Sequence, residues 1–82
     1  MILDDKRLQW KLRRGMLELD LFLDVFFNQG YADLSLEHKI LFQQLIELKD
    51  DHLFRLLMGH ESSDSEPLQL LIEAMRREVK RR

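Results

Sequence analysis

The sequence contains no cysteine, one proline and three glycines. Because cysteine is absent, neither a disulfide bond nor a thiolate-bound metal ion can stabilise the fold. Long apolar runs are also missing. The most apolar stretch, residues 17–27, is interrupted by Glu18, Asp20 and Asp24, and a membrane span needs about 20 continuous apolar residues. Apolar packing within a water-exposed domain must therefore hold this chain together.

Neither sign of charge dominates, since 13 Lys and Arg stand against 15 Asp and Glu. The strongly basic balance of a nucleic-acid-binding domain is missing, so we expect no nucleic-acid partner and no membrane insertion. Basic residues do cluster at 6–14 and 76–82. We interpret the second cluster as a solvated helix C-terminus, where positive charge suits the helix dipole. An acidic partner or a membrane surface is the alternative.

The length of 82 residues allows one small domain. A chain of this size buries only about 60–65 % of the surface that its unfolded form exposes, so its core is thin. An enzyme cleft usually needs more scaffold to enclose a substrate, and the size therefore favours a binding module. The residues that follow Met1 resemble neither a signal peptide nor a transit segment. We expect a complete chain in the bacterial cytoplasm.

Helical periodicity and turn residues predict a small single-domain five-helix bundle of the all-α class. The predicted helices cover about residues 4–13, 16–28, 35–48, 51–58 and 66–80. Gly15, Gly30 and Gly59 separate them, because glycine at a helix end tolerates a positive φ angle. The Ser- and acid-rich stretch 61–66 is predicted to be a linker. No strand-like alternation competes with this assignment.

Local signals support the individual helices. In the last helix, apolar residues recur with a period of 3.6 at Leu68, Leu71, Ile72, Met75 and Val79. Ser35 is the predicted N-cap of the third helix, and Asp50 or Asp51 that of the fourth. The five phenylalanines have helical spacing and are predicted to be nearly all core. Trp10 lies on a charged helix, and both a core and an interface position stay open for it.

The second helix is apolar around most of its axis, which is typical of a central helix. Glu18 interrupts this pattern. If Gly15 is the N-cap, Glu18 occupies the third helical position, where its carboxylate can accept a hydrogen bond from the N-cap amide. A second role is compatible with capping. Arg13, Arg14 and Glu18 would form a charged patch around a turn whose glycine allows close approach of a partner backbone.

The same segment carries a recognisable motif. Residues 10–20 read Trp-x-x-Arg-Arg-Gly-Met-x-Glu-Leu-Asp, and Phe26 and Phe27 follow. This pattern resembles the flavinylation (FAD assembly) factor family of succinate dehydrogenase, whose hallmark is Arg-Gly-x-x-Glu. The spacing of apolar and polar residues from 31 to 54 is similar to the family too. Leu56 departs from it, because many members carry tryptophan there.

The resemblance implies a helical bundle that binds the flavoprotein subunit of succinate dehydrogenase or fumarate reductase and promotes covalent attachment of FAD to it. The reacting histidine and the flavin would belong to the partner. This chain would then be no enzyme, would bind no cofactor stably and would be a monomer when free. The implied partner-binding residues are Arg14, Gly15 and Glu18, flanked by Arg13, Met16, Asp20 and Trp10.

Other functions stay open at this point. Family members are also described as antitoxins of toxin–antitoxin pairs, which is another protein-binding role. A DNA-binding regulator using the basic first helix is disfavoured by the near-neutral charge. An enzyme is disfavoured because no nucleophile and base are paired in the sequence. The three histidines are too scattered to predict a metal site, and no glycine-rich phosphate loop predicts an FAD site.

Overall fold

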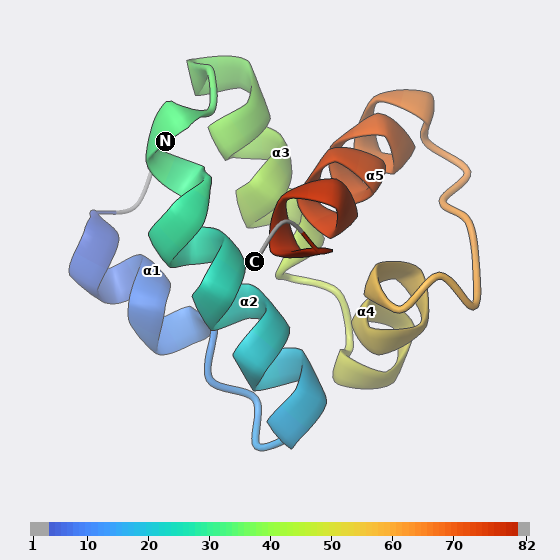
Figure 1. Ribbon diagram of the computed structural model, residues 1–82, viewed down its shortest axis with the longest axis horizontal. Helices are drawn as coiled ribbons and strands as arrows, with labels where there is room; N and C mark the ends of the chain where they lie inside the picture. Colours follow the sequence, from blue (N-terminus) through green and yellow to red (C-terminus); the bar gives the residue numbers. More distant parts are fainter. Residues whose placement is uncertain (1–3, 81–82) are drawn as a thin grey trace.

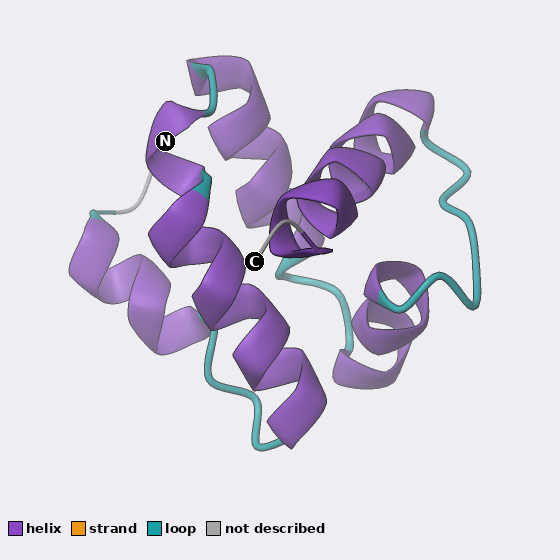
Figure 2. Cartoon of the chain, viewed as in Figure 1, coloured by secondary structure: helices purple, strands orange, loops and turns teal. Residues whose placement is uncertain are grey.

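The computed structural model describes residues 4–80. Within them the chain forms five α-helices and one turn of 3-10 helix, and no strand (Figures 1 and 2). The elements are α1 (Asp5–Lys11), α2 (Leu17–Gln29), η1 (Tyr31–Asp33), α3 (Leu36–Leu45), α4 (Asp50–Leu57) and α5 (Glu66–Lys80). The predicted all-α class and the five predicted helices are confirmed.

Two helices end earlier than predicted. Helix α1 stops at Lys11 and α3 at Leu45 because the chain tightens into 3-10-type turns. The backbone N–H of Arg13 donates to the carbonyl of Trp10 at 3.3 Å, and that of Leu48 donates to the carbonyl of Leu45 at 3.1 Å. Such i→i−3 bonds satisfy some of the terminal carbonyls that an α-helix leaves open.

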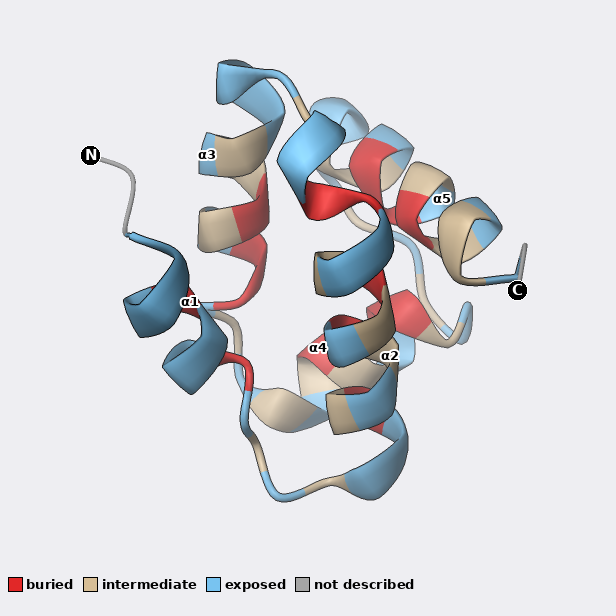
Figure 3. Ribbon diagram, turned by 60° about the vertical axis from the view of Figure 1, so that its left-hand side comes forward, coloured by how far each residue is buried: buried red, intermediate tan, exposed pale blue. Residues whose placement is uncertain are grey.

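Helix α2 runs through the middle of the molecule and contacts α5 and η1, while α3 and α4 also pack on α5. Figure 1 shows α1 beside α2 on the side away from α5. The inner faces of the helices form one apolar core (Figure 3). Its fully buried side chains include Leu8, Leu19, Leu23, Phe42, Leu45, Leu53, Leu56, Ile72 and Met75. Burial of this surface supplies most of the stabilisation of so short a chain.

The predicted central position of α2 holds for one of its faces only. Leu19, Leu23 and Phe26 are buried, whereas Leu17 is 74 % exposed and Leu21 is 55 % exposed. An apolar pair that lies one turn apart on the outside of a central helix does not serve the core of this chain. That pair belongs to the candidate site described below.

Aromatic rings fill the region between α2, η1 and α3. The ring centres of Phe26 and Phe42 lie 5.6 Å apart, and those of Tyr31 and Phe42 lie 5.1 Å apart. These are ordinary distances for favourable aromatic pairs. Burial, with the nearby charge of Asp5, raises the pKa of Tyr31. Of the five phenylalanines predicted to be nearly all core, Phe26 and Phe42 are buried. Phe22, Phe27 and Phe54 are only partly buried against the same core.

The cap predictions had mixed outcomes. Ser35 caps α3 as predicted, because its hydroxyl accepts a hydrogen bond from the backbone N–H of His38 at 3.2 Å. The prediction that Asp50 or Asp51 caps α4 was wrong. Lys49 occupies the N-cap position without a side-chain bond, and both aspartates lie in the first turn of α4. Asp50 is directed to another partner, Arg14.

The glycines at positions 30 and 59 end helices for different reasons. Gly59 has φ +82°, and the N–H of His60 donates to the carbonyl of Arg55 at 2.8 Å, which closes α4 as predicted. Gly30 has φ −129°, so the prediction of a positive φ was wrong there. A Cβ atom at this position would lie 3.0 Å from the Phe26 ring and 3.1 Å from Cγ of Glu78. Close packing of α5 therefore requires glycine.

The apolar stripe predicted for α5 is confirmed, since Leu71, Ile72 and Met75 are buried in the core. Of the basic cluster at 76–82, Arg76 is half-buried beside Gly59 and Lys80 is exposed. Its last members, Arg81 and Arg82, lie outside the described residues. Between residues 4 and 80, no helix combines the length and apolar character that a membrane span requires.

Candidate functional site

The turn between α1 and α2 contains the first half of the Arg-Gly-x-x-Glu motif. Gly15 is exposed and has φ +82°, a left-handed conformation that other residues adopt at a cost of about 1–2 kcal/mol. A Cβ atom placed on Gly15 would meet nothing within 4 Å. Glycine is therefore needed for the backbone conformation, and the absence of a side chain also leaves this backbone open to a partner.

The turn is held by Asp20, which lies in the first turns of α2. Its carboxylate accepts hydrogen bonds from the backbone N–H groups of Arg14, at 2.9 Å, and of Gly15, at 3.1 Å. Hydrogen bonds to a charged acceptor are stronger than those between neutral groups. Asp20 was predicted to flank the partner-binding surface, and the structure gives it this internal contact in addition.

The predicted capping role of Glu18 was wrong. Met16, and not Gly15, is the N-cap residue of α2, so Glu18 is the second helical residue and not the third. Its side chain is exposed, and it has no hydrogen bond or ion pair with residues 4–80. Met16 is partly buried against the core. Within the described residues, the exposed carboxylate of Glu18 therefore contributes to the fold only through its negative charge in the first turn of α2, which suits the helix dipole.

The side chain of Arg14 points inward. It is only 15 % exposed, and its Nη1 atom lies 3.2 Å from Oδ1 of Asp50 at the start of α4. Its Nη2 atom donates a hydrogen bond to the backbone carbonyl of Ile46, the residue that ends α3. The sequence-based interpretation did not connect Arg14 with Asp50. A charged residue in the first turn of a helix resembles a cap in any sequence, and nothing local distinguishes the two roles.

Arg13 and Trp10 lie on the surface. Trp10 is 75 % exposed, so it is not a core residue, and the predicted interface position stays a prediction. The guanidinium carbon of Arg13 lies 5.7 Å from the centre of the Trp10 ring, within the range of a cation–π interaction. Large exposed aromatic side chains of this kind are frequent among the residues that dominate binding energies at protein interfaces.

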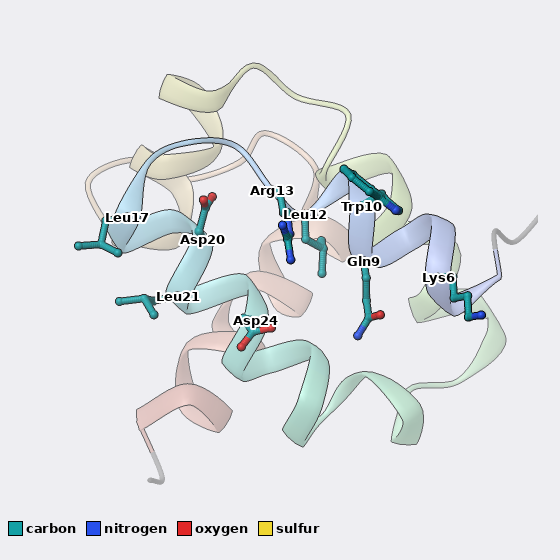
Figure 4. A pocket seen from close by; sticks show the side chains of 9 residues that line it. All are labelled: Lys6, Gln9, Trp10, Leu12, Arg13, Leu17, Asp20, Leu21 and Asp24. Atoms are coloured by element: carbon teal, nitrogen blue, oxygen red, sulfur yellow. The ribbon is translucent and has the colours of Figure 1, made fainter.

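A groove of about 690 Å³ runs between α1 and α2 (Figure 4). Its two sides follow the same helical spacing of i, i+3, i+4 and i+7, and Leu12 lies between them. Lys6, Gln9, Trp10 and Arg13 line the first side, and Leu17, Asp20, Leu21 and Asp24 line the second. In Figure 4, Gln9, Leu12 and Arg13 point from α1 and the following turn toward α2.

The two sides of the groove carry charges of opposite sign. Its α1 side carries the basic residues Lys6 and Arg13, and its α2 side carries the acidic residues Asp20 and Asp24. The exposed leucines of α2 form an apolar border along the second side. Among the predicted site residues, the structure brings Trp10, Arg13 and Asp20 together here. Sequence-based interpretation missed the other residues on the two sides, although their helical spacing is visible in the sequence. These are Lys6, Gln9, Leu17, Leu21 and Asp24.

The described residues contain no group of three or more His, Cys, Asp or Glu that could hold a metal ion. His52 pairs with Glu61, with 2.9 Å between Nε2 and Oε2. The turn that carries the motif exposes the backbone of Gly15 and the carboxylate of Glu18. The adjoining groove adds the exposed ring of Trp10 beside charges of both signs. This combination suits recognition of a protein surface.

Comparison with known proteins found a matching family model and several similar proteins. A family model described as "Flavinator of succinate dehydrogenase" matches residues 6–79. A protein of Idiomarina loihiensis named FAD assembly factor SdhE is 44 % identical over 77 residues, which cover 94 % of this chain and 86 % of that protein. Proteins of the same name from Shewanella oneidensis and Coxiella burnetii are 43 % and 37 % identical, each over 70 residues and 85 % of both chains. This chain therefore belongs to the family of succinate dehydrogenase flavinators.

Proposed function

We propose that this chain is an assembly factor that binds the flavoprotein subunit of succinate dehydrogenase and promotes covalent attachment of FAD to it. The family match over almost the whole chain and the shared name of its relatives support this proposal. They favour it over an antitoxin role. The flavoprotein subunit of fumarate reductase is a second client in the proposal.

The observation that best supports the proposal is the exposure of Gly15 and Glu18, two of the three residues of the Arg-Gly-x-x-Glu motif. Glu18 is exposed and unpaired among the described residues, and the backbone at Gly15 is uncovered. Trp10 and Arg13 lie on the adjoining groove. We assign the client-binding surface to the motif turn (residues 13–18) together with this groove. Glu18 and the Gly15 backbone would supply polar contacts, and Trp10 an apolar anchor.

The proposed mechanism is positioning. The reacting histidine and the flavin would both be carried by the client. When the histidine nitrogen bonds to the 8α-methyl carbon, a C–H bond of that methyl group and the histidine N–H bond break, and the flavin ring takes up the two electrons and two protons and is left reduced, so the step uses only client atoms. By holding the client in one conformation, the factor raises the share of time that the histidine spends at reactive distance. Orientation of this kind can lower a barrier by several kcal/mol without a catalytic group on the helper. Stable binding of FAD to this chain is not part of the proposal.

The test is co-expression of a flavoprotein subunit with or without this chain in cells that lack their own factor. Flavin fluorescence that remains on the denatured subunit in a gel measures covalent attachment. The diagnostic variant is Glu18→Ala. Its matched control is Glu37→Ala, because Glu37 is likewise the exposed second residue of a helix, α3. Both substitutions remove the same helix-dipole contribution.

We expect wild type and Glu37→Ala to raise covalent flavin, and Glu18→Ala to lose most of the increase while its helical circular dichroism is unchanged. If wild type changes nothing with either client, the proposed function is wrong. If Glu18→Ala and Glu37→Ala act alike, the function stands and the binding surface lies elsewhere.

A further inference from the structure

The motif arginine connects two turns that are distant in the sequence. Arg14 belongs to the turn between α1 and α2, and its guanidinium group reaches the turn between α3 and α4, where Asp50 and the Ile46 carbonyl accept its hydrogen bonds. Lys11 forms a second ion pair between the same regions, with Glu47. A shallow crease between the two turns is lined by Lys11, Arg13 and Arg14 on one side and by Ile46 and Glu47 on the other.

These contacts fix the motif turn from two directions. On one side, Asp20 holds the backbone N–H groups of Arg14 and Gly15. On the other side, the Arg14 side chain is tied to the C-terminus of α3 and the N-terminus of α4. A large shift of the Arg14 backbone would therefore disfavour these charge-assisted bonds, and Gly15 follows Arg14 directly in the chain.

The Arg14 side chain is accordingly poorly placed to meet a client. It is 15 % exposed, and a client carboxylate would have to displace Asp50 at 3.2 Å to pair with it. Breaking a partly buried ion pair leaves one charge without its partner, which is unfavourable. Glu18 has no hydrogen bond or ion pair with residues 4–80. The Gly15 N–H is held by Asp20, while nothing lies within 4 Å of the position that its Cβ atom would occupy.

We propose that Arg14 is a positioning residue for flavinylation and that Asp50, outside the motif, is its partner in this role. The pair holds the Gly15 turn in the conformation that the client recognises, and Arg14 itself does not touch the client. This inference rests on the proposed function, because it concerns the same client-binding surface. It divides the motif into an inward anchor, Arg14, and an outward contact surface, Gly15 and Glu18.

The experiment titrates the factor against an apo-flavoprotein subunit with FAD and measures covalent flavin by gel fluorescence. The variants are Arg14→Gln, Asp50→Asn and the double variant. Asp51→Asn is the matched control, because Asp51 is the neighbouring carboxylate in the first turn of α4 and pairs with Arg55 instead. Hydrogen exchange at the Arg14 and Gly15 amides is measured on the same samples.

A positioning role predicts that Arg14→Gln and Asp50→Asn each raise the factor concentration for half-maximal flavinylation about tenfold. The maximum rate at saturation should be unchanged, and the double variant should be no worse than either single one. Amide exchange at Gly15 should accelerate in all three. Asp51→Asn should match wild type. Asp50→Glu, which keeps the charge, should recover most of the affinity and also guards against a general folding defect in Asp50→Asn.

Direct contact between Arg14 and the client predicts the opposite behaviour of Asp50. Removing Asp50 would then free the guanidinium, so Asp50→Asn would equal or exceed wild type while Arg14→Gln stayed impaired. That pattern, or losses that multiply in the double variant, would overturn the positioning role. Failure of wild type itself to raise covalent flavin would instead contradict the proposed function, so the two failures are distinguishable.

Discussion

The carboxylate of Asp20 lies 3.1 Å from the backbone nitrogen of Gly15, so a residue of α2 fixes the turn that precedes α2. The same carboxylate also accepts the N–H of Arg14. Asp20 thus accepts hydrogen bonds from two successive backbone amides, which precede it by five and six residues. Together the two bonds restrain the backbone of the turn. The glycine and the aspartate of the motif region are thus parts of one local structure.

Replacing Asp20 with alanine should lower the free energy of unfolding by about 1–3 kcal/mol, because both amide donors lose a charged acceptor. Urea denaturation of the purified chain measures this change. The control is Asp24→Ala, one turn further along the same helix, whose carboxylate has no hydrogen bond with residues 4–80. Equal effects of the two substitutions would mean that the turn does not depend on Asp20.

Substitutions of Gly15 distinguish two reasons for glycine at this position, namely its positive φ angle and the access that it gives a client to the backbone. Gly15→Ala should destabilise the chain by about 1 kcal/mol because alanine disfavours positive φ, whereas Gly15→Asn should be milder because asparagine tolerates that region better. If a client backbone approaches Gly15, both variants should lose flavinylation, Asn included. If Gly15→Asn alone retains flavinylation activity, glycine is needed at this position only for its backbone conformation. Thermal unfolding and gel flavin fluorescence supply the two measurements.

Truncation of Trp10 should affect binding and not folding. Because the ring is 75 % exposed, Trp10→Ala should change the free energy of unfolding by less than about 0.5 kcal/mol. Its affinity for the flavoprotein subunit should fall by about 2 kcal/mol or more, as for other aromatic anchors. Isothermal titration calorimetry measures the affinity. Leu36→Ala, at a residue that is 67 % exposed outside the groove, should bind as wild type does.

An added methyl group at Gly30 should be costly. The new Cβ would lie 3.0 Å from the Phe26 ring, inside the core contact with α5. Forced overpacking of this kind costs about 1–3 kcal/mol, so Gly30→Ala should lower the midpoint of urea unfolding. Unchanged stability would show that Phe26 and Glu78 rearrange freely around the position.

Stability should fall in acid through three exposed carboxyl groups. A hydrogen bond from Lys11 lowers the pKa of Glu47 below its ordinary 4.5, and Arg55 lowers the pKa of Asp51 below 3.8 and that of Glu61 below 4.5. Since the unfolded chain binds these protons more readily, their stabilisation is present above pH 4.5 and is lost as the pH falls through the folded-state pKa values. Thermal melts from pH 7 to pH 2 measure it.

The ion pairs are solvent-exposed, so added salt should weaken this acid dependence. Arg55→Gln removes the partner of Asp51 and Glu61 and should flatten the pH profile below 4.5. An identical profile for wild type and Arg55→Gln would contradict the assignment.

The sequence predicted features that depend on neighbouring residues in the chain. The apolar stripe of α5, the Ser35 cap and the Gly59 turn are local, and all three are confirmed. The prediction for Glu18 was wrong because α2 has Met16 and not Gly15 as its N-cap. The prediction for Asp50 was wrong because a tertiary contact decides it. Asp50 is bound by Arg14, 36 residues away, and no local pattern encodes that distance. The groove was missed for the same reason, since it depends on how α1 lies against α2.

The packing of α5 on α2, α3 and α4 has a consequence for the synthesis of the chain. Until α5 has left the ribosome, the apolar side chains of α2, α3 and α4 that pack on it lack that cover. The nascent chain therefore exposes part of its future core to solvent, and closure of the core waits for the arrival of residues 66–80. Chaperones that recognise exposed apolar segments can bind the nascent chain during that interval.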